Sequence, residues 1–104
     1  MFARNVRMQL KPNSAVEFSR VFASEILPVL RRQKGFKDGM TFVSGERSEA
    51  ISISLWENRA SADAFHGSAY PRLILTLGGV IDGEPTISTH AVSNSTAHGL
   101  ASGH

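Results

Sequence analysis

The sequence contains no cysteine. Disulfide bonds, thiolate zinc sites, iron–sulfur clusters and cysteine nucleophiles are therefore excluded. The four histidines show neither H-x-x-x-H nor H-x-H spacing, so we expect no metal site. The chain also lacks G-x-G-x-x-G, P-loop and G-x-S-x-G patterns, so neither a nucleotide cofactor nor a hydrolytic triad is expected.

Excess charge of one sign and long apolar runs are also missing. Eleven Lys and Arg against nine Asp and Glu give a net charge of +2, too little to indicate a polyanionic partner. Apolar runs such as Ile26 to Leu30 are far shorter than the roughly 20 residues that a membrane span needs. Arg4 and Arg7 interrupt any signal-peptide core. We therefore expect a cytoplasmic protein that binds neither nucleic acid nor membrane.

The composition that remains is typical of one globular domain, with 104 residues of which 41% are hydrophobic and 19% charged. Alternation of apolar and polar residues over Phe2 to Leu10 predicts a strand. A helix is predicted to begin at Ser14, because Glu17 completes the spacing of a capping box. Pro28 is expected to bend this helix and Gly35 to end it.

The second half predicts a hairpin and a second helical region. Strands are expected at about residues 36–44 and 49–57, joined by turn chemistry at 44–48. Asn58 can cap a helix, Pro71 fits the first turn of a further short helix, and an extended run follows at 86–93. This order predicts an α+β, ferredoxin-like βαββαβ fold with a four-stranded antiparallel sheet over residues 1–93. Residues 94–104 are expected to form a flexible C-terminal tail.

Helices in such a fold can cover only one face of the sheet. We assign to the covered face the more apolar set of strand residues: Phe2, Val6, Met8, Phe42, Ile51, Ile53, Leu55 and Ile87. The opposite face is then expected to carry Asn5, Arg7, Val43, Ser52, Ser54, Trp56, Ser88 and His90. A tryptophan and a valine among small polar side chains are unusual on a solvated face, so this face is predicted to meet a second copy in a homodimer.

Several short motifs resemble those of the antibiotic biosynthesis monooxygenase-like family of dimeric α/β barrels. They are Leu55-Trp56-Glu57 at a strand end, Gly35-Phe36 after a helix containing Leu27-Pro28, and Gly83-x-Pro85 before the last strand. The resemblance covers about residues 2–93 and implies a dimeric α/β barrel. That family includes cofactor-independent oxygenases of quinols and anthrones, haem-degrading enzymes and many proteins of unknown activity.

The site residues of that family match only in part. In several quinol-type members two histidines follow the strand-ending tryptophan by nine and fourteen residues, where this chain has Phe65 and Tyr70, with His66 next to the first position. In the haem-degrading branch Asn5 matches an asparagine of the first strand. Phe65 and Leu75 replace the expected tryptophan and iron-binding histidine, and leucine cannot ligate iron. Haem breakdown is therefore not expected, and no cofactor is expected.

The resulting hypothesis is a cofactor-independent monooxygenase acting on a small aromatic, quinol- or anthrone-like substrate. His66 or Tyr70 would act on the substrate proton, and Asn5 would donate its amide to an oxyanion. Trp56 and Phe65 would bind the aromatic ring. Each residue also has a competing structural interpretation. These are simple packing for Trp56, an ordinary strand residue for Asn5, a helix-end contact with water for His66, and a cap of the pocket or interface for Tyr70.

Two other classes of function compete with the enzyme. One is a non-catalytic dimeric module of the same fold that binds a small ligand or a partner protein. The other is RNA recognition, because RNA-recognition domains share this order of elements and Lys34-Gly35-Phe36 begins like an RNP1 motif. That motif does not continue, and the predicted sheet lacks paired exposed aromatics on which bases stack, so RNA binding is not expected.

Overall fold

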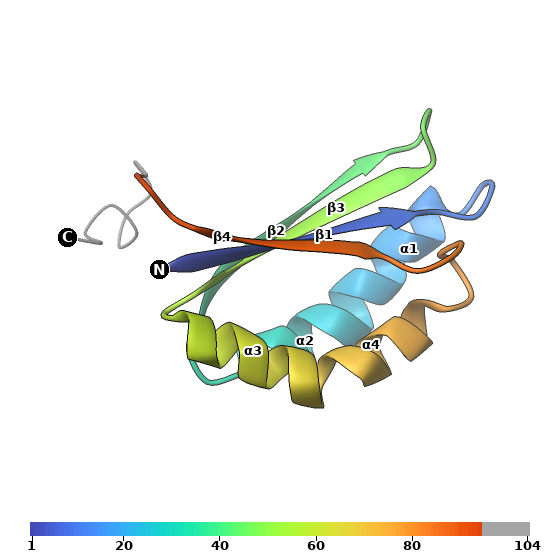
Figure 1. Ribbon diagram of the computed structural model, residues 1–104. Helices are drawn as coiled ribbons and strands as arrows, with labels where there is room; N and C mark the ends of the chain where they lie inside the picture. Colours follow the sequence, from blue (N-terminus) through green and yellow to red (C-terminus); the bar gives the residue numbers. More distant parts are fainter. Residues whose placement is uncertain (95–104) are drawn as a thin grey trace.

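The structure, a computed structural model, describes residues 1–94, and most of the predicted C-terminal tail lies outside the described residues. The elements in chain order are β1 (Phe2–Gln9), α1 (Ala15–Val21), the π-helix η1 (Phe22–Ile26), α2 (Leu27–Arg31), β2 (Phe36–Ser44), β3 (Glu49–Trp56), α3 (Arg59–Ser68), α4 (Tyr70–Leu77) and β4 (Thr86–Ala91). The strands pair antiparallel in the order β2-β3-β1-β4, and the helices lie on one face of the sheet (Figure 1). This is the predicted ferredoxin-like α+β fold.

The first helical region is continuous but changes type along its length. Phe18, Phe22, Ile26 and Leu30 are all buried, so this stripe attaches the region to the sheet. Pro28 lies in the first turn of α2, directly after η1. Proline has no N–H to donate and its ring crowds the carbonyl four residues earlier, so the helix accommodates it next to a wider π turn.

The start of this region differs from the prediction in one detail. The helix begins after Ser14 as expected, but the Ser14 side chain makes no capping hydrogen bond to the helix. Its hydroxyl donates instead to the carbonyl of Pro12, and Glu17 forms an ion pair with Arg20. The predicted capping box is therefore wrong, because both of its members have other partners.

The helix ends at Arg31, four residues before Gly35, so the predicted stop at Gly35 is wrong. Gly35 instead fixes the path into β2. Its φ of +83° is in the left-handed region that favours glycine, and a Cβ there would overlap the Ser61 side chain. The Glu57 amide donates to the Gly35 carbonyl at 2.7 Å. The glycine thus lets the loop before β2 approach the start of α3.

The hairpin and the second helical region form as predicted. β2 and β3 pair on either side of residues 45–48. The Asn58 side chain accepts a hydrogen bond from the Ser61 amide at 2.9 Å, which caps α3, and Pro71 lies in the first turn of α4. Among the described residues no helix is long and apolar enough to cross a membrane.

The prediction of which sheet face the helices cover is right for β1 and β4 and wrong for β2 and β3. Directly paired residues share a face, and Val6 pairs with Ser52 whereas Asn5 pairs with Ile53. Trp56 and Ala50 are fully buried on the covered face. The residues that move from the predicted covered face to the open face are Phe42, Ile51, Ile53 and Leu55. Those that move the other way are Val43, Ser52, Ser54 and Trp56.

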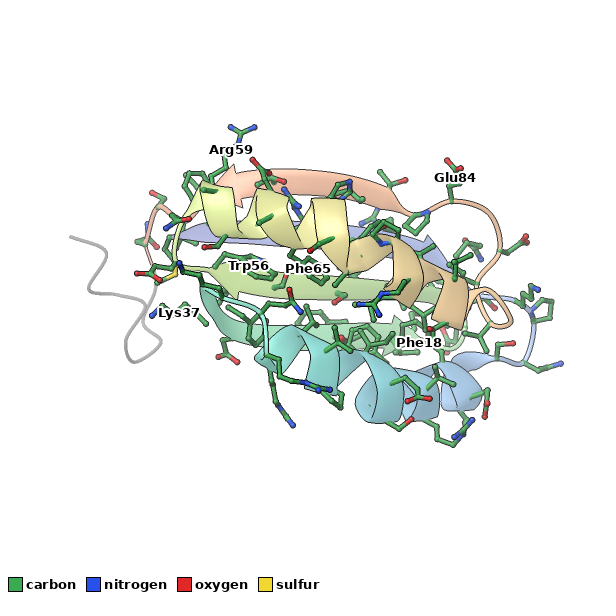
Figure 2. All side chains as sticks on the ribbon, turned by 90° about the horizontal axis from the view of Figure 1, so that it is seen from below. Phe18, Lys37, Trp56, Arg59, Phe65 and Glu84 are labelled. Carbon is green, nitrogen blue, oxygen red and sulfur yellow. The ribbon has the colours of Figure 1, made fainter. Side chains whose placement is uncertain are left out.

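The predicted orientation of β2 and β3 is wrong because β3 carries apolar side chains at both parities, so alternation alone could not orient it. The Trp56 side chain is the largest and takes the interior position. There its ring meets Phe36 edge-on at 5.5 Å and stacks on Phe65 at 5.2 Å between centroids. Figure 2 shows Trp56 and Phe65 side by side between α3 and the sheet.

Candidate functional site

A cavity lies between the covered face of the sheet and the helices. Its volume is about 40 Å³, and about 440 Å³ when its opening is included. β1, β3, η1, α2, α3 and α4 all contribute walls, and most lining side chains are apolar. A cavity of about 40 Å³ has room for one to three water molecules, whereas a cavity of roughly 150 Å³ is known to bind benzene. A flat ligand would therefore displace part of the wall.

Aromatic rings form one side of this cavity. Phe65 and Tyr70 line it, with their ring centroids 6.2 Å apart in an edge-on arrangement. Trp56 lies behind Phe65 and its Nε1 donates to the Ser54 hydroxyl at 2.9 Å. Ser54 itself lines the cavity, so Trp56 supports the wall through its two neighbours.

Tyr70 is half-buried at the first residue of α4. Burial raises the pKa of its hydroxyl, the nearby Arg4 charge lowers it, and Glu84 raises it, with a net increase. The phenol is therefore neutral at physiological pH and keeps its proton. Tyr70 thus lines the cavity as a neutral phenol.

His66 is exposed on α3 and does not line the cavity. Its ring stacks on that of Tyr70 with centroids 4.7 Å apart and an interplanar angle of 19°. The two residues are one helical turn apart, across the junction of α3 and α4. His66 consequently packs against Tyr70 without reaching the cavity interior.

Asn5 lies on the opposite face of the sheet from the cavity. It pairs with Ile53 of β3 and Ser88 of β4, and with Arg7 and Thr86 it lines a surface depression of about 220 Å³. The structure therefore brings Trp56, Phe65 and Tyr70 together, but it places Asn5 apart from them. Among residues 1–94 no three His, Asp or Glu side chains converge in a way that could hold a metal ion.

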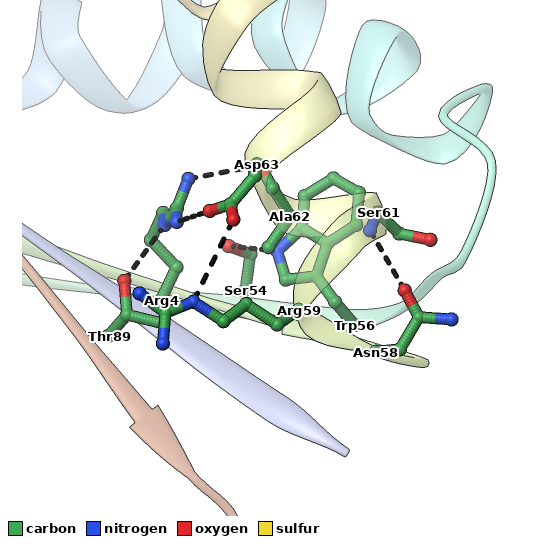
Figure 3. Close-up of polar contacts among 9 residues, drawn as sticks. All are labelled: Arg4, Ser54, Trp56, Asn58, Arg59, Ser61, Ala62, Asp63 and Thr89. Carbon is green, nitrogen blue, oxygen red and sulfur yellow. Dashed lines mark hydrogen bonds and ion pairs between the residues drawn. The ribbon is translucent and has the colours of Figure 1, made fainter.

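Arg4 is the residue of the cavity that the sequence reasoning missed. Its side chain is on the covered face of β1 and only 6% of the residue is exposed. Nε donates to Thr89 Oγ1 at 3.2 Å, Nη1 to the Ala62 carbonyl at 3.0 Å and Nη2 to Asp63 Oδ1 at 2.9 Å (Figure 3). The signal was available, because Arg4 occupies an interior position of an otherwise apolar alternation.

Solved structures of other proteins share this architecture. A protein of unknown function from Nitrosomonas europaea matches with a TM-score of 0.78 and 18% identity, covering 92% of each chain. SnoaB from Streptomyces nogalater, described as a cofactor-independent oxygenase, matches with a TM-score of 0.75 and 13% identity over 91% of this chain and 95% of its own. Rv0793 from Mycobacterium tuberculosis gives a TM-score of 0.72 at 16% identity, over 92% and 98% of the two chains.

At these identities the likenesses establish the fold alone. No curated protein matches the chain. The model of one protein family, described as antibiotic biosynthesis monooxygenase, matches residues 1–72, which is more than half of the sequence. The chain therefore belongs to the antibiotic biosynthesis monooxygenase family.

Proposed function

We propose that this protein is a cofactor-independent monooxygenase that acts on a small aromatic substrate of the quinol or anthrone class. The observation that carries the proposal is the position of Tyr70 and Phe65 in the wall of an otherwise mostly apolar cavity. An apolar site with a few convergent polar groups is the usual form of a small-ligand site. SnoaB, described as a cofactor-independent oxygenase, has the same fold.

The reaction needs a substrate that reduces dioxygen once it has lost a proton. For an anthrone, the carbanion adds O₂ to give a peroxide anion, which takes up a proton and then loses water to leave a ketone. The net change converts a CH₂ group and O₂ into C=O and H₂O. Apolar walls keep bulk water from the anion, and the neutral Tyr70 hydroxyl would donate to the developing peroxide.

The other candidate residues take supporting parts in this proposal. Phe65 would contact the substrate ring, and Trp56 would hold Phe65 in place by stacking. His66 would fix the Tyr70 ring from the solvent side. We propose no contact between Asn5 and a substrate bound in the same subunit, since the sheet lies between them.

We further propose that the open face of the sheet joins a second copy of the chain in a homodimer. That face carries Met40 and Phe42, of which 47% and 54% are exposed. Ile51, Ile53 and Leu55 lie beside them in register. A contiguous apolar surface of this kind is typical of an interface, and the family resemblance implies the same assembly.

A second candidate function is a non-catalytic module that binds a small ligand. The small closed volume of the cavity favours it, because about 40 Å³ does not accommodate a ring without movement of the walls. Binding without turnover would then be the whole activity.

Oxygen uptake with a panel of quinols and anthrones tests the proposal. We expect uptake above the buffer rate with at least one substrate, and a decrease of about 10²-fold or more in Tyr70→Phe, which removes the donor hydroxyl. Ser68→Ala is the matched control, because it removes an exposed hydroxyl two residues away that donates to the Ala64 carbonyl and does not line the cavity. No uptake with any substrate, or an unchanged rate in Tyr70→Phe, would contradict the proposal.

A further inference from the structure

The polar part of the cavity wall is positively charged and rich in donors. Arg4, Ser52, Ser54 and Tyr70 are its polar side chains, and within the described chain no Asp, Glu, His or Lys lines it. The Ser54 oxygen already accepts the Trp56 indole N–H, which leaves the serine proton for another acceptor. A bound molecule would therefore meet donors and one cation, with no side-chain base and no anion.

The charge of Arg4 is incompletely neutralised by its surroundings. Asp63, its one charged partner within residues 1–94, also pairs with Arg59 at 3.7 Å between Arg59 Nε and Asp63 Oδ2 (Figure 3). The Asp63 side chain is 56% exposed, so water screens it, whereas the Arg4 side chain is 7% exposed. One carboxylate thus serves two guanidinium groups, and the set has a net charge of +1.

Arg4 also retains hydrogen-bonding capacity. A guanidinium has five N–H groups, and Arg4 uses three of them within the described chain, on Thr89, Ala62 and Asp63. All three acceptors belong to β4 or α3, and none of them lines the cavity. A buried cation is costly unless it is fully paired, so a site with spare N–H groups and residual charge is suited to an anionic ligand.

We propose that Arg4 selects an anionic aromatic ligand, and that the cavity binds the ionised oxygen of a flat ring compound at the Arg4 guanidinium with the ring against Phe65. The inference rests on the proposed function for the location of the ligand and extends it to the ligand's charge. An adjacent cation lowers the pKa of a bound acid by about 1–3 units. The cavity has no side-chain base among the described residues, so the quinol or anthrone would give its proton to water before binding, and Arg4 would favour the resulting anion.

Equilibrium dialysis with a matched pair of probes tests this inference. 2-Hydroxy-1,4-naphthoquinone, a vinylogous acid, is an anion at pH 7, and 2-methoxy-1,4-naphthoquinone is its neutral counterpart of similar shape. We expect the wild type to prefer the anion, and Arg4→Met to reduce anion affinity by about 10- to 100-fold while leaving the neutral probe unaffected. Arg72→Met is the control, because it removes a positive charge from the exposed side of α4, outside the cavity.

Asp63→Asn provides a test in the opposite direction, in which the residue replaced is the exposed Asp63 and not the buried Arg4. Removing the competing carboxylate should tighten anion binding by about two- to fivefold and leave the neutral probe unchanged. If Arg4→Met does not fold, as judged by circular dichroism, this variant decides. Equal affinity for both probes, no binding of either, a preference that survives in folded Arg4→Met, or an unchanged Asp63→Asn would each overturn the inference.

The two proposals fail separately. A preference for the anion that depends on Arg4, without oxygen uptake from any substrate, would refute the monooxygenase and leave the anion site standing. Oxygen uptake in a protein that binds both probes equally would refute the anion site and leave the monooxygenase proposal standing.

Discussion

Tyr70 is the single tyrosine of the chain, so its ionisation can be followed directly by the ultraviolet absorbance of tyrosinate. Burial raises its pKa, Arg4 lowers it and Glu84 raises it, with burial the largest effect. We expect the titration of the folded protein to give a higher pKa than the titration of the protein unfolded in urea. Arg4→Met should raise the pKa further, because it removes the positive charge that favours the phenolate.

The same shift affects stability at high pH. The folded state holds the Tyr70 proton more tightly than the unfolded state, whose tyrosine pKa is about 10. The stabilisation is therefore complete below that pH and is lost as the pH rises through the folded-state pKa. Relative to Tyr70→Phe, the wild type should lose free energy of unfolding above about pH 10. A folded-state pKa equal to or below the unfolded value would contradict the assignment.

Site residues could be predicted from the sequence where a motif set their spacing along the chain. They could not be predicted where the position depended on which face of the sheet a strand residue occupies. Trp56, Phe65 and Tyr70 follow one another at set spacing, and the structure does bring them together. Asn5 was chosen by its match to a family position, but the parity of β1 places it across the sheet from Tyr70. The alternation of β1 that directs Asn5 to the open face directs the neighbouring Arg4 to the covered face, where it lines the cavity.

At the scale of elements, η1 explains how the first helical region stays on the sheet. Its buried stripe repeats at strict intervals of four: Phe18, Phe22, Ile26 and Leu30. Four residues overshoot one turn of an α-helix by about 40°, so a pure α-helix would rotate this stripe away from the sheet. A π turn takes more residues per turn and rotates the stripe back. The sequence pattern predicted a helix bent at Pro28, but it did not predict the π segment that precedes this proline.

Two glycines make a matched test of the loop that joins this region to β2. Gly35→Ala should destabilise the fold by at least about 1–2 kcal/mol, because Ala disfavours a positive φ and its Cβ would overlap Ser61. Gly67→Ala, inside α3 with open space around the new Cβ, should stabilise it by roughly 0.5–1 kcal/mol. Urea unfolding of both variants measures the two changes. Equal effects of the two substitutions would refute the close approach at Gly35.

For the molecule as a whole, the wrong orientation predicted for β2 and β3 is informative. A strand that is buried on both faces is apolar at both parities, whereas a strand with one solvated face alternates clearly. β3 has Ala50 and Trp56 toward the helices and Ile51, Ile53 and Leu55 toward the open side. Its ambiguous pattern is thus what a second covering layer would require. The sequence was sufficient for the order of elements, but the register between strands was needed to separate the two faces.

The homodimer proposal can be tested on that open face. Light scattering at micromolar concentration should give about twice the chain mass of 11.3 kDa for the wild type. Ile53→Asp places a charge at the centre of the open face, where burial in an interface would leave it unpaired, and should yield the monomer. Leu75→Asp is the control, since Leu75 is 80% exposed on α4, on the helical side of the molecule. A wild-type protein of single-chain mass, or equal responses to the two aspartates, would show that the apolar open face does not join two copies.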